Sequence, residues 1–125
     1  MAKKILLVED DQYTQDVYQE ILKEAGFEVT LAIDGQEGLQ KAQEGGYNLI
    51  LLDIMMPKMD GLTLLKELKA NPPKKDNGPI IMLTNLSHDP IVSEGLSLGA
   101  KSYVTKSDIN PDQLVSKVKE FLKIE

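Results

Sequence analysis

Residues 49–53 read LILLD, an apolar run of four residues that ends in an aspartate. Two similar runs occur at residues 5–8 (ILLV), before three acidic residues, and at residues 80–83 (IIML), before Thr84. A weaker run at residues 103–104 precedes Lys106 by one residue. Short uninterrupted apolar runs are typical of strands that are buried on both faces. We therefore predict four buried strands, each with a polar residue at or just beyond its carboxyl end.

A fifth strand is predicted at Glu28–Ala32, where Val29 and Leu31 alternate with polar residues. Alternation of this kind indicates a strand that is half exposed, so we place it at an edge of the sheet.

Segments with apolar residues at helical spacing separate the predicted strands. Gly26 follows the first of these segments, while Asn110 and Pro111 open the last one as an N-cap and a first helical residue. The segment at 36–44 has a poorer pattern, and residues 71–79, with three prolines, predict a surface loop. The apolar positions are Tyr13, Val17, Ile21 and Leu22; Leu39 and Ala42; Leu62, Leu65 and Leu68; Ile91, Val92 and Leu96; and Leu114, Val115, Val118, Phe121 and Leu122. The repeated strand–helix order predicts an α/β fold with a parallel sheet covered on both faces.

Composition narrows the possible functions of the chain. A length of 125 residues suits one domain, and the hydrophobic and charged fractions of 42% and 27% are those of globular proteins. The chain has no cysteine and one histidine, His88, which argues against disulfides, thiolate metal sites and a histidine zinc site. A net charge of −6 disfavours direct nucleic-acid binding. The apolar runs are too short to cross a membrane and the N-terminus lacks a signal-peptide pattern, so we expect a cytoplasmic location.

Polar residues that follow parallel strands converge, because ligands of open α/β sheets bind beyond the carboxyl ends of the strands. Taken singly, Asp53 or Thr84 is as easily explained as a helix cap. Together, clustered carboxylates favour a divalent cation such as Mg2+, and a hydroxyl and an ammonium group supply donors to an oxyanion. This combination predicts a site for phosphoryl chemistry. The residues concerned are Glu9, Asp10, Asp11, Asp53, Thr84 and Lys106.

With these motifs the chain resembles, over residues 1–125, the receiver domain of two-component response regulators, in particular a stand-alone receiver of the chemotaxis-regulator type. A receiver domain cut from a longer protein is the alternative. The motifs are VEDD at 8–11, LLDIMMPKMDG at 51–61, LT at 83–84 and YVTK at 103–106. The resemblance implies a flavodoxin-like, doubly wound sheet of five parallel strands in the order 2-1-3-4-5, with five helices.

The resemblance also implies a role for each matching residue. Asp53 would accept a phosphoryl group from a sensor histidine kinase or a histidine phosphotransfer protein. Mg2+ would be bound by Asp10, Asp53 and the backbone carbonyl of Met55, with Glu9 acting through water. Thr84 and Lys106 would hold phosphoryl oxygens. Tyr103 would change rotamer on activation, although a tyrosine that packs at the sheet edge with its hydroxyl in water is an alternative.

The expected output of such a domain is a change of surface and not catalytic turnover. Phosphorylation would alter the face formed by the fourth helix, the fifth strand and the last helix, for a downstream protein or effector domain. The only expected reaction after phosphorylation is self-dephosphorylation, and no direct contact with nucleic acid or membrane is expected.

One position departs from the family pattern, because Ser107 replaces the proline that usually follows the lysine. A cis bond without proline costs roughly 3 kcal/mol, so we predict a trans Lys106–Ser107 peptide. Asp11 either joins the acidic pair or opens the first helix, and the spacing to Gly26 favours the second role. Met55, Met56 and Met59 are interpreted as filler, and His88 is assigned no role.

Other classes of protein fit the sequence less well. A flavodoxin would need a phosphate-cradling loop where the acidic cluster stands, and a P-loop protein would need a glycine-rich motif that does not occur. An aspartyl phosphatase typically carries a second acid two residues after its nucleophile, where this chain has Met55. A receiver-like interaction module that is never phosphorylated is a further alternative, and the full set of site residues argues against it.

Overall fold

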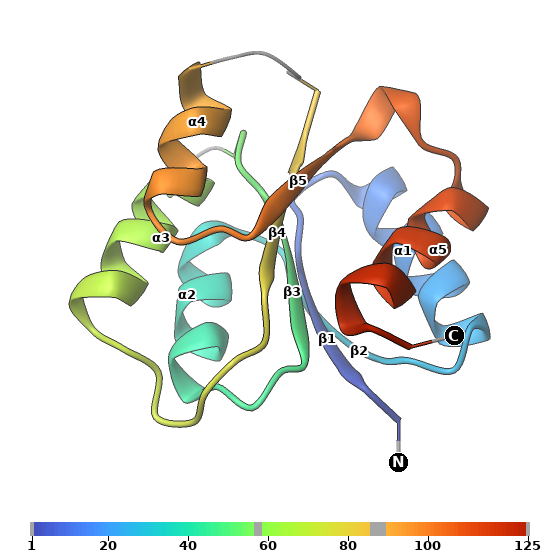
Figure 1. Cartoon of the computed structure of the whole chain (residues 1–125), viewed down its shortest axis with the longest axis horizontal. Coiled ribbons are helices and arrows are strands. Elements are labelled where there is room, and N and C mark those ends of the chain that lie inside the picture. The colour runs from blue at the N-terminus through green and yellow to red at the C-terminus, as the bar shows by residue number, and fades with distance from the viewer. Residues whose placement is uncertain (1, 57–58, 86–89, 125) are drawn as a thin grey trace.

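The computed structural model describes residues 2–56, 59–85 and 90–124, which form a five-stranded sheet between two layers of helices (Figure 1). The elements in chain order are β1 (Lys4–Val8), α1 (Gln12–Glu24), β2 (Glu28–Ala32), α2 (Gly35–Glu44), β3 (Leu49–Asp53), α3 (Gly61–Ala70), β4 (Ile80–Thr84), α4 (Pro90–Ser97), β5 (Ser102–Thr105), the short 3-10 turn η1 (Lys106–Asp108) and α5 (Pro111–Leu122).

All neighbouring strands are parallel, and their order is β2-β1-β3-β4-β5, as predicted. The register aligns Val8 with Leu52 and Asp53 with Leu83, so the ends of the three central strands lie at one edge of the sheet. β2 is an edge strand as predicted, and β5 forms the other edge. The prediction that residues 103–104 are buried on both faces was wrong. Val104 is buried but Tyr103 is only half-buried, because an edge strand has a neighbour on one side only.

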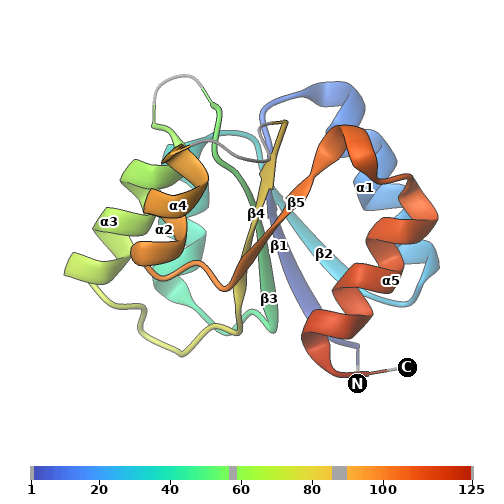
Figure 2. The same cartoon turned by 45° about the horizontal axis from the view of Figure 1, so that its top comes forward.

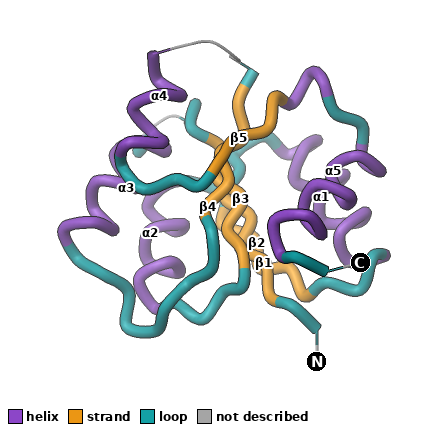
Figure 3. The backbone as a smooth tube through the Cα atoms, in the orientation of Figure 1, coloured by secondary structure: helices purple, strands orange, loops and turns teal. Residues whose placement is uncertain are grey.

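Successive strand residues enter two different hydrophobic cores. Figure 2 shows α2, α3 and α4 on one face of the sheet and α1 and α5 on the other, and the loops that join these layers are traced in Figure 3. Leu6 and Ile50 pack under α2, α3 and α4, whereas Leu7 and Leu51 pack under α1 and α5. This alternation explains why the strand sequences are apolar throughout.

The buried face of α1 is partly the predicted one, since Leu22 is buried and Val17 and Ile21 pack against the core. Tyr13, predicted to face the core, is 76% exposed, whereas Gln15, Tyr18 and Leu22 are buried. Tyr13 lies in the first turn of α1, directly after the exposed residues Asp11 and Gln12. Leu96, at the end of α4, is likewise 40% exposed and not a core residue.

Helix α2 packs on the sheet through small residues, which explains its poor apolar pattern. Its buried residues are Gly35, Gly38 and Ala42. A Cβ atom added at Gly38 would lie 2.6 Å from Cγ1 of Val8, so the helix backbone approaches β1 as closely as a glycine allows.

The loop at 71–79 is held against the end of α2 by Asn77. Its Oδ1 accepts a hydrogen bond from the Tyr47 amide (3.1 Å), and its Nδ2 donates to the Ala42 carbonyl (2.9 Å). Within the described part of the chain, no helix is long and apolar enough to span a membrane.

Candidate functional site

A crevice of about 420 Å3 opens at the carboxyl edge of the sheet, where the predicted site residues meet. Segments far apart in the sequence contribute to it, from the ends of β1, β3, β4 and β5. The residues that line the crevice are Glu9, Asp10, Asp11, Thr14, Asp53, Met55, Asn85, Lys106 and Ser107.

Glu9, directly after β1, is buried, and both its backbone and its side chain are hydrogen-bonded. Its side chain is 0% exposed, its amide donates to the Ala32 carbonyl (3.0 Å), and its Oε2 accepts from the Asp11 amide (3.2 Å). The pKa of Glu9 is raised to about 7, mainly by burial; Asp53 also raises this pKa, whereas Lys106 lowers it.

Lys106 joins the two buried acids. Its Nζ lies 2.6 Å from Oε1 of Glu9 and 3.2 Å from Oδ2 of Asp53. Burial lowers the pKa of Lys106, but the hydrogen bond to Glu9 and the charges of Asp53 and Glu9 outweigh it and leave the pKa raised. No peptide bond among the described residues is cis, so the Lys106–Ser107 bond is trans, as predicted.

Asp53 ends β3 with its carboxylate fixed in orientation. Oδ1 accepts a hydrogen bond from the Met55 amide (2.9 Å), and Oδ2 faces the Lys106 ammonium group. The side chain is buried but lines the crevice, so a ligand in the crevice can reach its carboxylate.

Three carboxylates are close enough to share one cation. Oxygen atoms of Glu9, Asp10 and Asp53 lie within 4.8 Å of one another, and oxygen-only donor sets are those that Mg2+ takes. The residues present therefore fit a hard divalent ion. Asp10 is the most accessible of the three.

Asp11 has the second of its two predicted roles, since it caps helix α1. Its Oδ2 accepts hydrogen bonds from the Thr14 hydroxyl (2.7 Å) and the Thr14 amide (2.9 Å). Both hydrogen bonds lower the pKa of Asp11, and the bond from the Thr14 hydroxyl has the larger effect. The carboxylate is thereby committed to the helix terminus.

The remaining predicted residues lie around this centre. Thr84 is buried at the end of β4, next to the end of β3, and Tyr103 packs against the core under α2, α3 and α4. Met55 is 54% exposed, whereas Met56 is buried. Pro57, Lys58 and His88 lie outside the described residues.

Gln15 is a buried residue at the site that the sequence pattern did not single out. Its Nε2 donates a hydrogen bond of 2.8 Å to the backbone carbonyl of Glu9. Helical spacing could have predicted its burial, because Gln15 stands three residues before Tyr18 and seven before Leu22 and so shares a helix face with them.

A doubly wound parallel sheet with clustered carboxylates and a lysine at its carboxyl edge is the arrangement expected of a phosphoacceptor signalling domain. The family model for the response regulator receiver domain matches residues 5–119, so this chain belongs to the receiver family of two-component systems.

Relatives of known sequence agree with this assignment. The chain is 38% identical over 123 residues to the alkaline phosphatase synthesis transcriptional regulatory protein PhoP of Bacillus subtilis, a match that covers 98% of this chain and 50% of that protein. It is 39% identical over 120 residues to a transcriptional regulatory protein CpxR homolog of Haemophilus influenzae, covering 96% and 50%. The chain thus spans about half the length of these relatives.

Solved structures agree as well. A CheY-like receiver domain protein from Methanospirillum hungatei shares 35% identity at a TM-score of 0.86, and the match covers 98% of this chain and 95% of that one. The receiver domain of sensor histidine kinase PA1611 from Pseudomonas aeruginosa has a magnesium ion coordinated in its active-site cleft. It shares 29% identity at a TM-score of 0.83, covering 98% and 99%.

Proposed function

We propose that residues 1–125 act as one receiver unit, which takes a phosphoryl group on Asp53 in a Mg2+-dependent reaction. The observation that carries this proposal is the buried Asp53 carboxylate, which lies beside Glu9 and Asp10 with the Lys106 ammonium group 3.2 Å away. In this proposal the donor is a phosphohistidine on a sensor histidine kinase or a histidine phosphotransfer protein, and the reaction takes place in the cytoplasm.

The transfer forms a bond between phosphorus and a carboxylate oxygen of Asp53 and breaks the bond from phosphorus to the donor imidazole nitrogen. The Met55 amide holds Oδ1, which orients the carboxylate for attack. Lys106 faces Oδ2 and, with the Thr84 hydroxyl, would stabilise negative charge on the phosphoryl oxygens.

The acidic residues around Asp53 would hold the metal ion. Asp10, Asp53 and the Met55 carbonyl would be direct ligands, and Glu9 would act through water. A bound Mg2+ supplies positive charge that offsets the charge of the phosphoryl group. Among this chain's own groups, Lys106 pairs with Glu9 and so offsets the repulsion between the buried acids.

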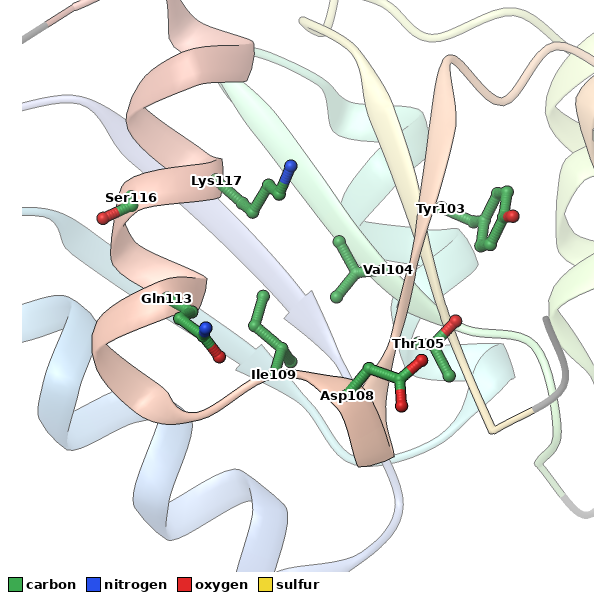
Figure 4. A pocket seen from close by; sticks show the side chains of 8 residues that line it. All are labelled: Tyr103, Val104, Thr105, Asp108, Ile109, Gln113, Ser116 and Lys117. Atoms are coloured by element: carbon green, nitrogen blue, oxygen red, sulfur yellow. The ribbon is translucent and has the colours of Figure 1, made fainter.

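The output surface in this proposal is the face of α4, β5 and α5. A pocket of about 390 Å3 lies between β5 and α5 on this face. Figure 4 shows the side chains that line it, among them Val104, Ile109 and Lys117. Tyr103 also lines the pocket, but its ring lies on the side of β5 away from Val104 and packs against the core under α2, α3 and α4. A rotamer change of Tyr103 would therefore alter the surface beside this pocket, for a downstream protein or effector domain.

Phosphorylation by a small donor tests the proposal. Incubation with acetyl phosphate and Mg2+ should add one phosphoryl group, detected by intact mass, and EDTA should prevent the addition. Asp53→Asn should add none, whereas Asp60→Asn, an exposed aspartate that caps α3, should behave like the wild type. Phosphoryl gain by Asp53→Asn would refute the site.

The same experiment separates the alternative functions. An aspartyl phosphatase would also hydrolyse a phosphate ester offered in place of acetyl phosphate, over many turnovers, whereas a receiver would release phosphate only by losing its own phosphoryl group. A module that is never phosphorylated would gain no mass with Mg2+ present.

A further inference from the structure

Four polar or charged side chains among the described residues are buried, and three of them belong to the proposed site: Glu9, Asp53 and Thr84. The fourth is Gln15, which is 7% exposed and lies in the first turns of α1. Its amide donates to the backbone carbonyl of Glu9, across six residues of the chain. A buried polar side chain aimed at the turn that carries the acidic pair calls for a physical account.

The hydrogen bond from Gln15 fixes the orientation of the Glu9–Asp10 peptide, which is a rigid unit. The Glu9 carbonyl and the Asp10 nitrogen belong to one planar peptide, so fixing the oxygen also fixes the position from which Asp10 projects. The amide of Glu9 is separately bonded to the Ala32 carbonyl (3.0 Å). Gln15 itself is fixed by its main chain, whose nitrogen donates to the Asp11 carbonyl (2.9 Å).

The neutral charge of Gln15 suits this position. Lys106 already places one cation beside Glu9 and Asp53, and an amide holds the turn without adding a second one that would compete electrostatically with a metal ion. Since Gln15 is nearly excluded from water, no solvent molecule readily replaces its hydrogen bond.

We infer that Gln15 is a positioning residue for the metal site, because it orients the Glu9–Asp10 peptide so that both carboxylates face Asp53. This inference rests on the proposed function. It predicts that loss of the amide weakens Mg2+ binding, while the chemistry at Asp53 is preserved once the metal is bound.

The test compares Gln15→Met, which keeps the length of the side chain but cannot donate, with Gln19→Met. Gln19 lies one turn further along α1 and is only half-buried. NMR titration with Mg2+, followed at the Asp10 and Asp53 amides, gives the Kd of each variant. The carbonyl carbon shift of Glu9 reports the hydrogen bond directly.

In Gln15→Met we expect the Glu9 carbonyl shift to move and the Mg2+ Kd to rise about three- to ten-fold, the effect of one lost hydrogen bond. At saturating Mg2+ its phosphorylation rate with acetyl phosphate should return to the wild-type value. Gln19→Met should match the wild type in all three measurements.

An unchanged Kd in folded Gln15→Met, despite a moved carbonyl shift, would overturn the inference and leave Gln15 a packing residue. If Gln15→Met does not fold, the Mg2+ titration of the wild type tests the inference instead. The NMR signal of the Gln15 side-chain amide should then shift with the same Kd as the signal of the Asp10 amide. A Gln15 amide that stays unmoved would also overturn the inference. Failure of the wild type to bind Mg2+ would instead refute the proposed function.

Discussion

At the scale of single residues, Glu9 couples folding to pH. Its pKa is about 7 in the folded chain, against an ordinary value of 4.5 for a glutamate in water. Between these values the folded chain holds a proton that the unfolded chain releases, so the free energy of unfolding should fall as pH rises through this window. The slope for one proton is at most about 1.4 kcal/mol per pH unit. Urea unfolding in EDTA between pH 5 and pH 8 measures it.

The matched control is Glu9→Gln, which keeps the size of the side chain and removes the titration. Its free energy of unfolding should vary less with pH over the same range. The raised pKa values of Tyr18 and Lys106 and the lowered pKa of Asp11 lie outside this window, so they do not mask the effect. Parallel curves for the two proteins would contradict the prediction.

At the scale of elements, the contact of α2 with β1 depends on Gly38. Alanine there adds about 1 kcal/mol of helix propensity, but its Cβ would lie 2.6 Å from Val8 Cγ1 and 3.2 Å from Leu64 Cδ1. We expect the clash to dominate, so that Gly38→Ala lowers the free energy of unfolding by about 1–3 kcal/mol. Urea unfolding measures the change.

A double-mutant cycle identifies the cause of this loss. Val8→Ala removes the methyl groups that the new Cβ would strike, so Val8→Ala with Gly38→Ala should cost less than the sum of the two single changes. Strict additivity would mean that α2 is not held at its closest approach to β1.

The second prediction at this scale concerns the loop at 71–79 and its attachment to α2. Asn77→Ala removes two hydrogen bonds, to Tyr47 and Ala42, and should lower the free energy of unfolding by about 1–3 kcal/mol. Asn71→Ala, at an exposed residue just after α3, serves as the control and should change stability little. Equal losses in the two variants would show that the attachment of Asn77 contributes nothing.

At the scale of the whole molecule, the proposed switch links Asp53 to the face of α4, β5 and α5. Thr84 stands at the end of β4, between the end of β3 and β5 in the sheet. A phosphoryl group on Asp53 would attract its hydroxyl and so favour a different position of Tyr103 on the neighbouring strand. A ligand shifts such an equilibrium only by its differential affinity for the two states.

Beryllofluoride, a phosphoryl mimic, tests this link through amide chemical shifts. The wild type should show shifts both in the crevice and at Tyr103 and α5, whereas Thr84→Ala should bind the mimic with shifts confined to the crevice. Thr63→Ala, on the exposed side of α3, is the control and should respond like the wild type. Wild-type shifts confined to the crevice would rule out this route.

Local patterns in the sequence determined the elements and their order. Apolar runs marked the interior strands because every second residue enters a different core, and Asn110 with Pro111 marked the start of α5, where a capping box forms. The repeated strand–helix order implied the parallel sheet. Since parallel strands end at one edge, the same order also implied that Asp53, Thr84 and Lys106 lie near each other.

Tertiary structure alone decided which faces touch and which distant groups pair. Tyr13 is exposed while Gln15 is buried, Gly38 packs because it lacks a side chain, and Lys106 reaches Glu9 across 97 residues. Periodicity reports only that a helix has an apolar side and where a strand begins and ends. The rotation of each helix on the sheet and the pairing of its polar groups depend on packing against residues far away in sequence, which no local pattern contains.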